Sequence, residues 1–321
     1  AWVTIQIGCD NNCAFCIVPA VRGAEVSRPF DDVIAEVQRF ADDGVTEVTL
    51  LGQNVNSYGR DLQLARRRAG DVDARPRPLF ADLLGAVGAV EGIRRVRFTS
   101  PHPKDMRPET FEAMASSPEV CEHLHYPLQS GSDRVLALMH RGYTAERYLD
   151  RLVEARSTIP DLAVSTDIIV GFPGETEDDF ERTLEVAAAA EYDYAYTFIY
   201  SPRPGTEAAE AVDDFIDADV ARERFDRLRV VVERSALARH EARVGRLEEV
   251  LVEGPSKRDP SVTSGRTRQN KLVHFTPPRP LRAGSYATVE ITRGAPHFLE
   301  GNFVELLVEA THRTRIPVLS L

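Results

Sequence analysis

The sequence is poor in several residue types, and each scarcity excludes a class of protein. It has only four cysteines and one tryptophan in 321 residues, and no apolar run approaches the roughly 20 residues that span a membrane. We therefore expect no membrane association. We also expect a cytoplasmic protein without a disulfide framework, because thiols stay reduced in that compartment. The net charge of −11 argues against a protein that coats nucleic acid indiscriminately, although it permits a local basic site. An initial methionine is also missing, so we expect part of a longer protein.

Short apolar runs alternate with amphipathic helical segments over the first 242 residues. Strands are predicted at residues 2–7, 45–51, 94–99, 123–128, 162–170 and 194–200. Helices are predicted between and after them, at residues 31–43, 79–90, 108–116, 133–139, 145–157, 177–190 and 218–242. Such alternation is typical of a parallel sheet built from βα units. Because a complete TIM barrel has eight units, this pattern predicts an α/β domain over residues 1–242, a partial (β/α)6 TIM-like barrel.

The pattern changes after about residue 242. Short β-type runs, broken by Gly-Pro, Pro-Pro and Arg-Gly, lie at residues 250–252, 272–275, 287–291 and 303–308. They predict a small all-β barrel of five strands over residues 243–312, followed by a C-terminal tail at 313–321. Within the first domain, the segment 59–78 carries six arginines and little apolar content. It is predicted to be a mobile surface loop, with RNA contact as the alternative.

Polar or Gly-rich segments follow the predicted strands, where barrels of this kind hold their active sites. The cysteine cluster follows the first strand, and the other segments lie at residues 52–54, 100–102, 129–132, 171–175 and 201–206. Any one of them could be an ordinary turn, but six in succession predict a functional site at this end of the sheet.

Three of the four cysteines lie within eight positions, as Cys9, Cys13 and Cys16, in a C-x3-C-x2-C pattern. Structural zinc takes four protein ligands, and no fourth cysteine or nearby histidine in the sequence completes this set. Three thiolates can instead hold three irons of a cubane and leave the fourth iron open to another ligand. A zinc site and a purely structural cysteine cluster remain alternatives. Cys121 stands alone and is expected to be a small buried hydrophobe.

The cysteine pattern after the first strand of a partial barrel resembles the signature of radical S-adenosylmethionine enzymes. More closely, the chain is similar to the tRNA methylthiotransferases from Trp2 to about Val308. This similarity is carried, in order, by the segments GCDNNCAFCIVPAVRGAEVSRP, LLGQNVNSYG, HYPLQSGSDRVLALMHRGYT, DIIVGFPGETEDDF and YSPRPGTEAA. LGQNVNSY resembles the branch of the family that acts on N6-dimethylallyladenosine. The C-terminal module resembles a TRAM domain, a small RNA-binding barrel.

The resemblance implies which residues bind the cluster and the adenine. Cys9, Cys13 and Cys16 would ligate a 4Fe–4S cluster, and the amino and carboxylate groups of S-adenosylmethionine would chelate its open iron. Phe15 would pack near the adenine of S-adenosylmethionine, and Gly171 would lie against that adenine.

The resemblance also implies contacts to the rest of S-adenosylmethionine. Gln53 and Asn54 would face its methionine amino group, and Gln129 and Ser130 would lie on the ribose side. Asp167 stands where the family pattern often has glycine.

The reaction and its partners are implied in the same way. Reductive cleavage of S-adenosylmethionine would give methionine and a 5′-deoxyadenosyl radical. The radical would initiate replacement of an adenine C–H bond by C–S–CH3 in the anticodon arm of tRNA. An electron donor such as flavodoxin or ferredoxin would supply the electron. Family members also have an N-terminal domain whose three cysteines hold a second, auxiliary cluster. Nothing in this sequence corresponds to that domain, so we expect one cluster here, cleavage of S-adenosylmethionine, and no completed methylthiolation.

Two alternatives stay open. The chain could be a radical methylthiotransferase that acts on threonylcarbamoyladenosine in tRNA or on a ribosomal protein. It could also be a non-enzymatic RNA-binding protein with a structural metal. The charge of the C-terminal module bears on this choice, since nine basic against five acidic residues between Val244 and Arg293 give a net charge of +4. A basic module on an acidic body is typical of a phosphate-binding site, and a solvated β surface is the alternative. The basic residues are Arg246, Lys257, Arg258, Arg266, Arg268, Lys271, Arg279, Arg282 and Arg293.

Overall fold

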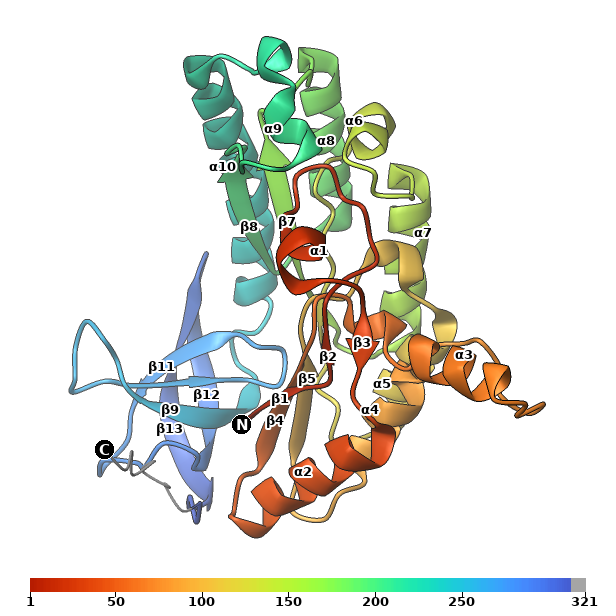
Figure 1. Cartoon of the computed structure of the whole chain (residues 1–321). Helices are drawn as coiled ribbons and strands as arrows, with labels where there is room; N and C mark the ends of the chain where they lie inside the picture. The colour runs from red at the N-terminus through yellow and green to blue at the C-terminus, as the bar shows by residue number, and fades with distance from the viewer. Residues whose placement is uncertain (313–321) are drawn as a thin grey trace, which may run out of the picture.

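The structure, a computed structural model, describes residues 1–312; the tail predicted at 313–321 lies outside this range. Within the described range, six parallel strands form a curved, open sheet in chain order (Figure 1). They are β1 (Trp2–Thr4), β4 (Glu47–Leu51), β5 (Arg95–Phe98), β6 (His123–His125), β7 (Ala163–Val170) and β8 (Tyr194–Ile199). The sheet has two halves, β1-β4-β5 and β6-β7-β8, and backbone hydrogen bonds from Val96 to Glu119 and Cys121 join them. The predicted partial (β/α)6 barrel is confirmed.

Helices cover the outer face of this sheet. The longer ones are α2 (Phe30–Asp42), α4 (Phe80–Gly88), α5 (Pro108–Ser116), α7 (Ala145–Thr158), α8 (Glu177–Ala190) and α10 (Ala218–Glu241). Local signals define their ends: α8 begins at a capping box in which Thr176 and Asp179 satisfy each other's backbone N–H groups. The short elements at the carboxyl ends of the strands are α1 (Val18–Arg22), α6 (Asp133–Leu138), α9 (Glu207–Glu210), η1 (Val55–Ser57), η2 (Pro103–Asp105) and η3 (Val212–Asp214). No helix within residues 1–312 is long and apolar enough to cross a membrane.

The register of the strands sorts their side chains into two faces. Val48, Leu50, Val96, Leu124 and Val164 are fully buried between the sheet and the helices. Since successive side chains on a strand point to opposite faces, their neighbours line the inside of the barrel. These inner residues, which pair across the strands, include Trp2, Glu47, Thr49, Arg95, Arg97, His125, Ser165, Asp167, Tyr194, Tyr196 and Phe198. The outer face thus holds the core, and the inner face presents polar and aromatic groups.

The strand predicted at residues 2–7 is divided in two. β1 pairs in parallel with β4, whereas β2 (Gln6–Ile7) pairs in antiparallel fashion with β3 (Val26–Ser27). Because β2 and β3 bracket the cysteine segment, the two ends of that segment are held side by side.

The segment 59–78 is not a loop throughout, so that prediction was wrong. It contains α3 (Arg60–Arg68), which projects from the body of the molecule (Figure 1). Arginine, leucine, alanine and glutamine all favour helix, but this helix lacks the apolar face on which the prediction depended.

The C-terminal module is a closed barrel of five strands, as predicted. Its strands are β9 (Leu247–Pro255), β10 (Thr263–Arg266), β11 (Leu272–Thr276), β12 (Tyr286–Ala295) and β13 (Phe298–Val308), in the order β10-β11-β13-β12-β9. A separate core fills it, formed by Val250, Val252, Val273, Phe275, Ala287, Val289, Ile291 and Leu299.

This C-terminal barrel packs against the amino-terminal ends of the parallel strands. Arg95, whose side chain is fully buried, donates hydrogen bonds to the carbonyl oxygens of Arg266 and Glu249, at 2.9 and 2.8 Å. The ammonium of Lys271 lies 2.5 Å from the Asp193 carboxylate, just before β8. The carboxyl ends of the strands, where the polar segments lie, therefore face away from this interface.

Candidate functional site

The three clustered cysteines lie in the loop between β2 and α1, at the carboxyl end of the sheet (Figure 1). All three thiols are partly exposed, whereas Cys121 is buried, as predicted. The loop starts at Gly8, whose φ is +76° and whose added Cβ would lie 2.0 Å from the Ala24 carbonyl oxygen. Only glycine fits this position without displacing the backbone.

The end of α6 holds the cysteine loop in place. Ala14 donates its backbone N–H to the Met139 carbonyl at 3.2 Å, and the His140 ring donates to the Asn12 carbonyl at 3.0 Å. On the other side, Ala208 donates its N–H to the Ala14 carbonyl at 2.9 Å. The loop is therefore positioned by segments about 130 and 190 residues further along the chain.

Arg141 reaches the cysteines themselves. Its guanidinium is buried and donates a hydrogen bond to the Cys13 sulfur at 3.3 Å and another to the Tyr143 hydroxyl at 3.2 Å. The Tyr143 hydroxyl in turn donates to the Leu128 carbonyl at 2.9 Å. Arg141 thus places a buried positive charge beside one of the three sulfurs. At Cys9, burial is the main effect and raises the pKa of the thiol.

The donor set fits a cubane better than a single ion. Within residues 1–312, no three His, Cys, Asp or Glu side chains converge on a point where they could hold one metal ion. A cubane does not require such a point, because each thiolate binds a different iron.

The loop after β4 holds amide oxygens that have no partner in the described part of the chain. They are Oε1 of Gln53 and Oδ1 of Asn54, and both are buried. The Asn54 amide nitrogen is already used, since it donates to the Asp105 carboxylate at 2.8 Å. A buried acceptor without a donor is costly, and a ligand ammonium would supply up to three donors. These two side chains therefore fit the expected contact with the methionine amino group.

Sequence reasoning assigned no role to His102, which lies in the loop after β5. It is 7% exposed, and burial lowers its pKa to about 2, so the imidazole is neutral. Its Nδ1 accepts the Lys104 backbone N–H at 3.2 Å, which leaves the proton on Nε2, and this donor has no partner within residues 1–312. The adjacent Lys104 ammonium donates to the Asn11 side chain, in the cysteine loop, at 2.5 Å.

The sequence likewise predicted no role for Glu25. Burial, helped by nearby carboxylates such as Asp10 and opposed by a hydrogen bond from Ser57, raises its pKa to about 7. The Ser57 hydroxyl donates to Glu25 at 2.6 Å, which links the end of the cysteine loop to the loop after β4. The sequence held no signal for Glu25, Arg141 or His102 beyond their presence in the polar segments.

Gln129 and Ser130 are brought to the same end of the sheet, in different ways. Gln129 adopts a left-handed backbone conformation, with φ +69°, and its backbone bonds to β7 on both sides. Ser130 is fully buried, and its hydroxyl lies 3.3 Å from the Thr183 hydroxyl on α8. Ser130 thus fixes the loop against α8. Because its hydroxyl is engaged there, Gln129 is the residue of this pair that can contact a ribose.

Packing against α10 explains why glycine occupies position 171. Its φ is +69°, and an added Cβ would lie 2.9 Å from the Ala221 Cβ. Its N–H donates to the buried Glu175 carboxylate at 2.8 Å, and the Arg224 guanidinium holds the same carboxylate at 2.9 Å. Phe15 lies near the loop after β7, where its ring meets that of Phe172 edge to face at a centroid distance of 6.4 Å.

The inner face of the barrel carries exposed aromatic side chains below the cysteine loop. Tyr196 and Phe198, on the edge strand β8, are 48% and 49% exposed. Tyr196 lies against His125 at a centroid distance of 6.1 Å, and His125 bonds to Asp167 at 3.3 Å. Trp2, on the opposite edge strand β1, is 77% exposed. The open barrel therefore has aromatic side chains on both edge strands and polar side chains, such as His125 and Asp167, between them. Such a space can accept a planar, partly apolar group.

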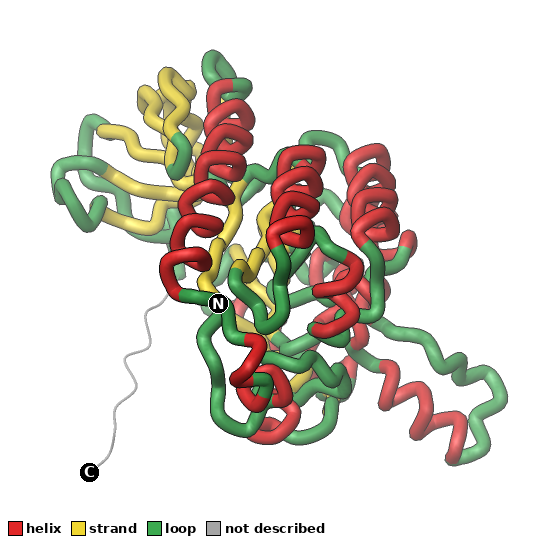
Figure 2. Tube along the Cα trace, turned by 90° about the horizontal axis from the view of Figure 1, so that it is seen from above, coloured by secondary structure: helices red, strands yellow, loops and turns green. Residues whose placement is uncertain are grey.

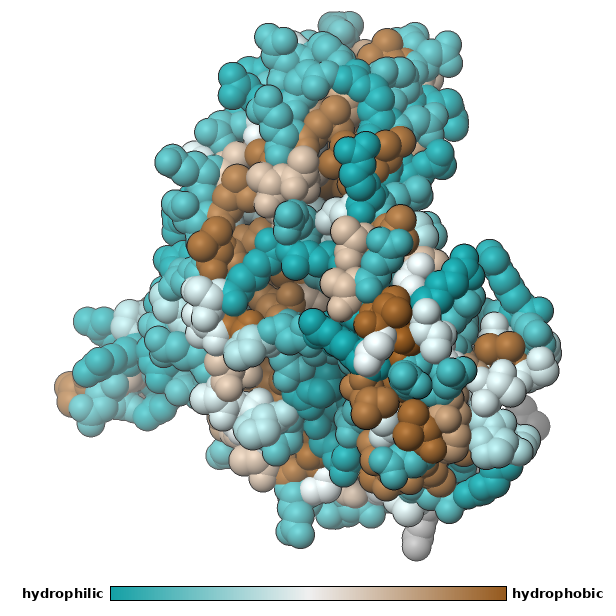
Figure 3. Space-filling model, turned by 180° about the vertical axis from the view of Figure 1, so that it is seen from behind, coloured by the Kyte–Doolittle hydropathy of each residue, from teal (hydrophilic) through white to brown (hydrophobic). Residues whose placement is uncertain are grey.

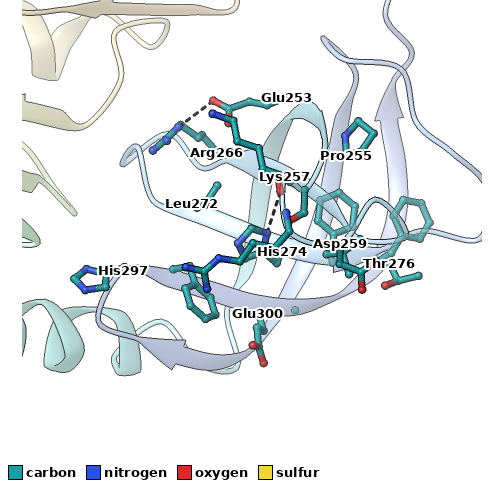
Figure 4. A pocket seen from close by; sticks show the side chains of 18 of the residues that line it. Glu253, Pro255, Lys257, Asp259, Arg266, Leu272, His274, Thr276, His297 and Glu300 are labelled. Carbon is teal, nitrogen blue, oxygen red and sulfur yellow. Dashed lines mark hydrogen bonds and ion pairs between the residues drawn. The ribbon is translucent and has the colours of Figure 1, made fainter.

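The C-terminal barrel presents a second candidate surface, a groove of about 1040 Å³ (Figure 4). His274 and Phe298 meet in it edge to face, at a centroid distance of 5.3 Å. Lys257 and Arg258 line the same groove and form no ion pair within residues 1–312.

The other basic residues of this module have partners. Six form ion pairs: Arg246 with Asp161, Arg266 with Glu253, Arg268 with Glu122, Lys271 with Asp193, Arg279 with Glu309 and Arg293 with Glu300. Arg282 donates to the carbonyls of Ala310 and His312. Most of the predicted basic surface is therefore neutralised locally or used in docking the two barrels.

Comparison with known proteins agrees with this geometry. Residues 3–187 match the model of the radical SAM superfamily, and residues 241–304 match the TRAM domain. Curated relatives named tRNA-2-methylthio-N(6)-dimethylallyladenosine synthase include one from Nocardia farcinica, 49% identical over 98% of this chain and 62% of its own length. Another, from Acidothermus cellulolyticus, is 52% identical over 93% of this chain and 58% of its own length. The chain thus spans about three fifths of the length of these relatives.

Among solved structures, coproporphyrinogen III oxidase from Escherichia coli, described as a radical SAM enzyme, covers 90% of this chain. It has 16% identity and a TM-score of 0.48, and 66% of its own chain is covered. The family match over more than half of the sequence, together with the cysteine loop at the strand ends, decides the assignment. The chain belongs to the radical SAM superfamily, which implies a 4Fe–4S cluster and S-adenosylmethionine.

Proposed function

We propose that this chain is the radical and RNA-binding portion of a tRNA methylthiotransferase that modifies C2 of N6-dimethylallyladenosine next to the anticodon. The observation that carries the proposal is the identity of about 50%, over 93–98% of the chain, to proteins named for that product. The alternative substrates, threonylcarbamoyladenosine tRNA and a ribosomal protein, become outcomes of the test below.

Each group of residues has a defined task in this proposal. Cys9, Cys13 and Cys16 hold the cluster, and Arg141 positions the Cys13 sulfur through a hydrogen bond of 3.3 Å. When bound, the cluster and S-adenosylmethionine supply the carbon-centred radical that removes hydrogen from the substrate. The unpartnered amide oxygens of Gln53 and Asn54 bind and orient the methionine ammonium.

The remaining contacts to S-adenosylmethionine are set by the loops after β6 and β7. Gln129 lies on the ribose side, with Ser130 fixing its loop against α8. Phe15 and Gly171 border the adenine position, where Phe172 closes the apolar side. This arrangement excludes water from the adenine and leaves the inside of the barrel open to the substrate base.

The substrate base occupies the barrel interior. Tyr196 and Phe198 offer exposed rings on one edge of the opening, and Trp2 offers another on the opposite edge. Aromatic rings stack on nucleobases without regard to sequence, and apolar surface suits a dimethylallyl group. Lys257 and Arg258, beside the groove of the C-terminal barrel, contact phosphates of the anticodon arm.

The electron donor and the source of sulfur are proposed from the resemblance to the methylthiotransferase family. A reductant such as flavodoxin or ferredoxin supplies the electron in the cytoplasm, where tRNA is modified. A second cluster, in a region that the relatives have and this chain does not span, supplies the sulfur. The four cysteines of this chain provide one such triad only.

The test is anaerobic reconstitution of the chain with iron and sulfide, followed by measurement of 5′-deoxyadenosine after reduction. We expect about four irons per chain and formation of 5′-deoxyadenosine that tRNA carrying N6-dimethylallyladenosine stimulates. Stimulation by threonylcarbamoyladenosine tRNA or by a ribosomal protein instead would establish one of the alternatives. Binding of zinc without iron, together with no 5′-deoxyadenosine, would refute the proposal that the chain is an enzyme. Mass spectrometry of the digested tRNA should show no methylthio group, because no second cysteine triad is present.

A further inference from the structure

The segment 59–78, which we call the arginine arm, has no role in the site described above. It leaves the loop after β4, runs outward as α3, turns at Gly70 and returns to α4 (Figure 2). In the space-filling view its surface is largely hydrophilic (Figure 3). Its apolar side chains Leu64 and Val72 are 37% and 93% exposed, so its tip adds little to the core.

The base of the arm is firmly held. The Asp61 carboxylate accepts the Ser27 backbone N–H at 2.9 Å, and the Gly59 N–H donates to the Ser27 hydroxyl at the same distance. Gln63, one turn into α3, is 7% exposed. Because Ser27 belongs to β3, the arm is attached to the hairpin that brackets the cysteine loop. Its position relative to the cysteines is therefore fixed.

The charge of the arm is unbalanced. Six arginines against three aspartates give it a net charge of +3, in a chain of −11. Arg66 pairs with Asp71 at 2.6 Å, and Arg77 pairs with Asp82 at 2.7 Å. Among residues 1–312, no hydrogen-bond or ion-pair partner is found for the side chains of the remaining exposed arginines, which are Arg60, Arg67, Arg68 and Arg75.

A purely local explanation accounts for only part of this pattern. Arginines in the last turn of α3 interact favourably with the helix dipole. However, Arg67 and Arg68 are about 100° apart around the helix, so they present charge in two directions. Arg75 lies on the returning loop of the arm, where it has no helix end to stabilise. An exposed set of arginines of this kind suits a polyanion.

The position of the arm indicates which polyanion. In Figure 1 the arm and the C-terminal barrel lie on opposite sides of the cysteine loop. An RNA whose base enters the barrel interior would have phosphates on both sides of the entrance. Lys257 and Arg258 provide cations for the phosphates on one side. The arm provides cations for the other.

We propose that the arginine arm binds the phosphate backbone of the substrate tRNA, opposite the C-terminal barrel. This inference rests on the proposed function, since it takes tRNA as the substrate. Arg67, Arg68 and Arg75 supply the phosphate contacts, and the anchored base of the arm sets their distance from the cysteine loop.

The test compares tRNA binding by the 321-residue chain with that of a variant carrying Arg67→Ala, Arg68→Ala and Arg75→Ala. Each lost phosphate contact lowers the slope of log K against log salt by about 0.9 for a duplex. We therefore expect the slope to fall by about 2–3 and the affinity at 0.1 M salt to drop tenfold or more. The corresponding three Arg→Lys changes should keep most of the slope, because charge rather than shape is needed.

The matched control carries Arg182→Ala, Arg222→Ala and Arg234→Ala, which are exposed arginines on α8 and α10. It should bind tRNA like the unaltered chain. All variants should form 5′-deoxyadenosine without RNA at the normal rate. Equal affinity and slope in the arm variant would overturn the inference while leaving the proposed function intact. Failure of the unaltered chain to bind tRNA would instead count against the proposed function.

Discussion

At the scale of single residues, the cysteine loop is organised by side chains from distant parts of the chain. Arg141 lies 128 positions after Cys13, yet its guanidinium is 3.3 Å from that sulfur. Lys104 donates to Asn11 at 2.5 Å, and Ser57 donates to Glu25 at 2.6 Å. Spacing within the cysteine motif predicts the ligands, but such partners come from the fold and have no local pattern.

Replacing Cys9, Cys13 or Cys16 with alanine should abolish both iron binding and formation of 5′-deoxyadenosine. Each thiolate holds one iron, so the cubane cannot be retained on two ligands. Cys121→Ala is the control, because this thiol is buried away from the loop and should affect neither property. Iron content after anaerobic reconstitution measures the effect, and a full complement of iron in Cys13→Ala would contradict the assignment.

His240 should make the stability of the chain depend on pH. It is 3% exposed at the end of α10, and burial lowers its pKa to about 4. In the unfolded chain the pKa is about 6.5, so between pH 6.5 and pH 4 the unfolded state binds a proton that the folded state does not. The free energy of unfolding should therefore decrease as the pH falls through this window, by up to about 1.4 kcal/mol per pH unit from this residue.

Urea unfolding at pH 7 and pH 5 measures this effect. His240→Gln should show a smaller loss of stability between the two pH values than the unaltered chain. His297→Gln, at an exposed position, is the control and should keep the original difference. An identical pH dependence in His240→Gln would show that folding does not lower the pKa of His240.

At the scale of elements, short apolar runs between helical segments were the best guide to structure. Strands that bury one face against helices give such runs, and the six barrel strands were predicted from them. β10, with the sequence TSGR, has no apolar run and could not be recognised. α3 was missed for the related reason that an exposed helix has no apolar face. The pattern therefore predicts elements that bury apolar side chains and fails for elements that do not, whether buried and polar like β10 or exposed like α3.

The inner face of β8 should bind the modified base. Phe198→Ala should weaken binding of an anticodon stem-loop that carries N6-dimethylallyladenosine, since loss of one stacking ring costs about 1–3 kcal/mol. The loss should be smaller for the same stem-loop with unmodified adenosine, which lacks the apolar group. Formation of 5′-deoxyadenosine without RNA should not change.

Ile199→Ala is the matched control for this experiment. Ile199 follows Phe198 on the same strand but points to the opposite face, away from the barrel interior. Binding assays on both variants, with both stem-loops, decide the matter. Equal losses in the two variants would mean that the effect comes from the packing of β8 rather than from contact with the base.

At the scale of the whole molecule, the charge of the C-terminal module has a second use that composition could not reveal. The sequence predicts a basic surface of net charge +4, but Arg268 and Lys271 reach across to Glu122 and Asp193 of the large barrel. Arg95 of the large barrel likewise donates to the backbone of the module. A count of charges cannot separate residues that face solvent from residues that join two domains. Removing the module would therefore expose Arg95 and Asp193 as well as remove an RNA-binding surface.

Lys271 is the residue at which docking and RNA binding can be separated. Its side chain is almost fully buried, and Asp193, whose other carboxylate oxygen accepts the Val164 N–H at 2.8 Å, is nearly as inaccessible. Lys271→Met keeps the length of the side chain but leaves the Asp193 carboxylate buried without its cation. Breaking a buried pair in this way costs about 3–5 kcal/mol, whereas removing an exposed partner costs less than about 1 kcal/mol.

Urea unfolding of the 321-residue chain should therefore show a large loss of stability for Lys271→Met. The control Arg279→Met removes an exposed ion pair with Glu309 and should show almost no loss. Adding Asp193→Asn to Lys271→Met should restore part of the stability, because the uncompensated charge is gone. Under conditions where Lys271→Met is folded, its affinity for tRNA and the salt dependence of that affinity should equal those of the unaltered chain. A normal stability combined with weakened tRNA binding would place Lys271 on the RNA surface and not in the interface between the barrels.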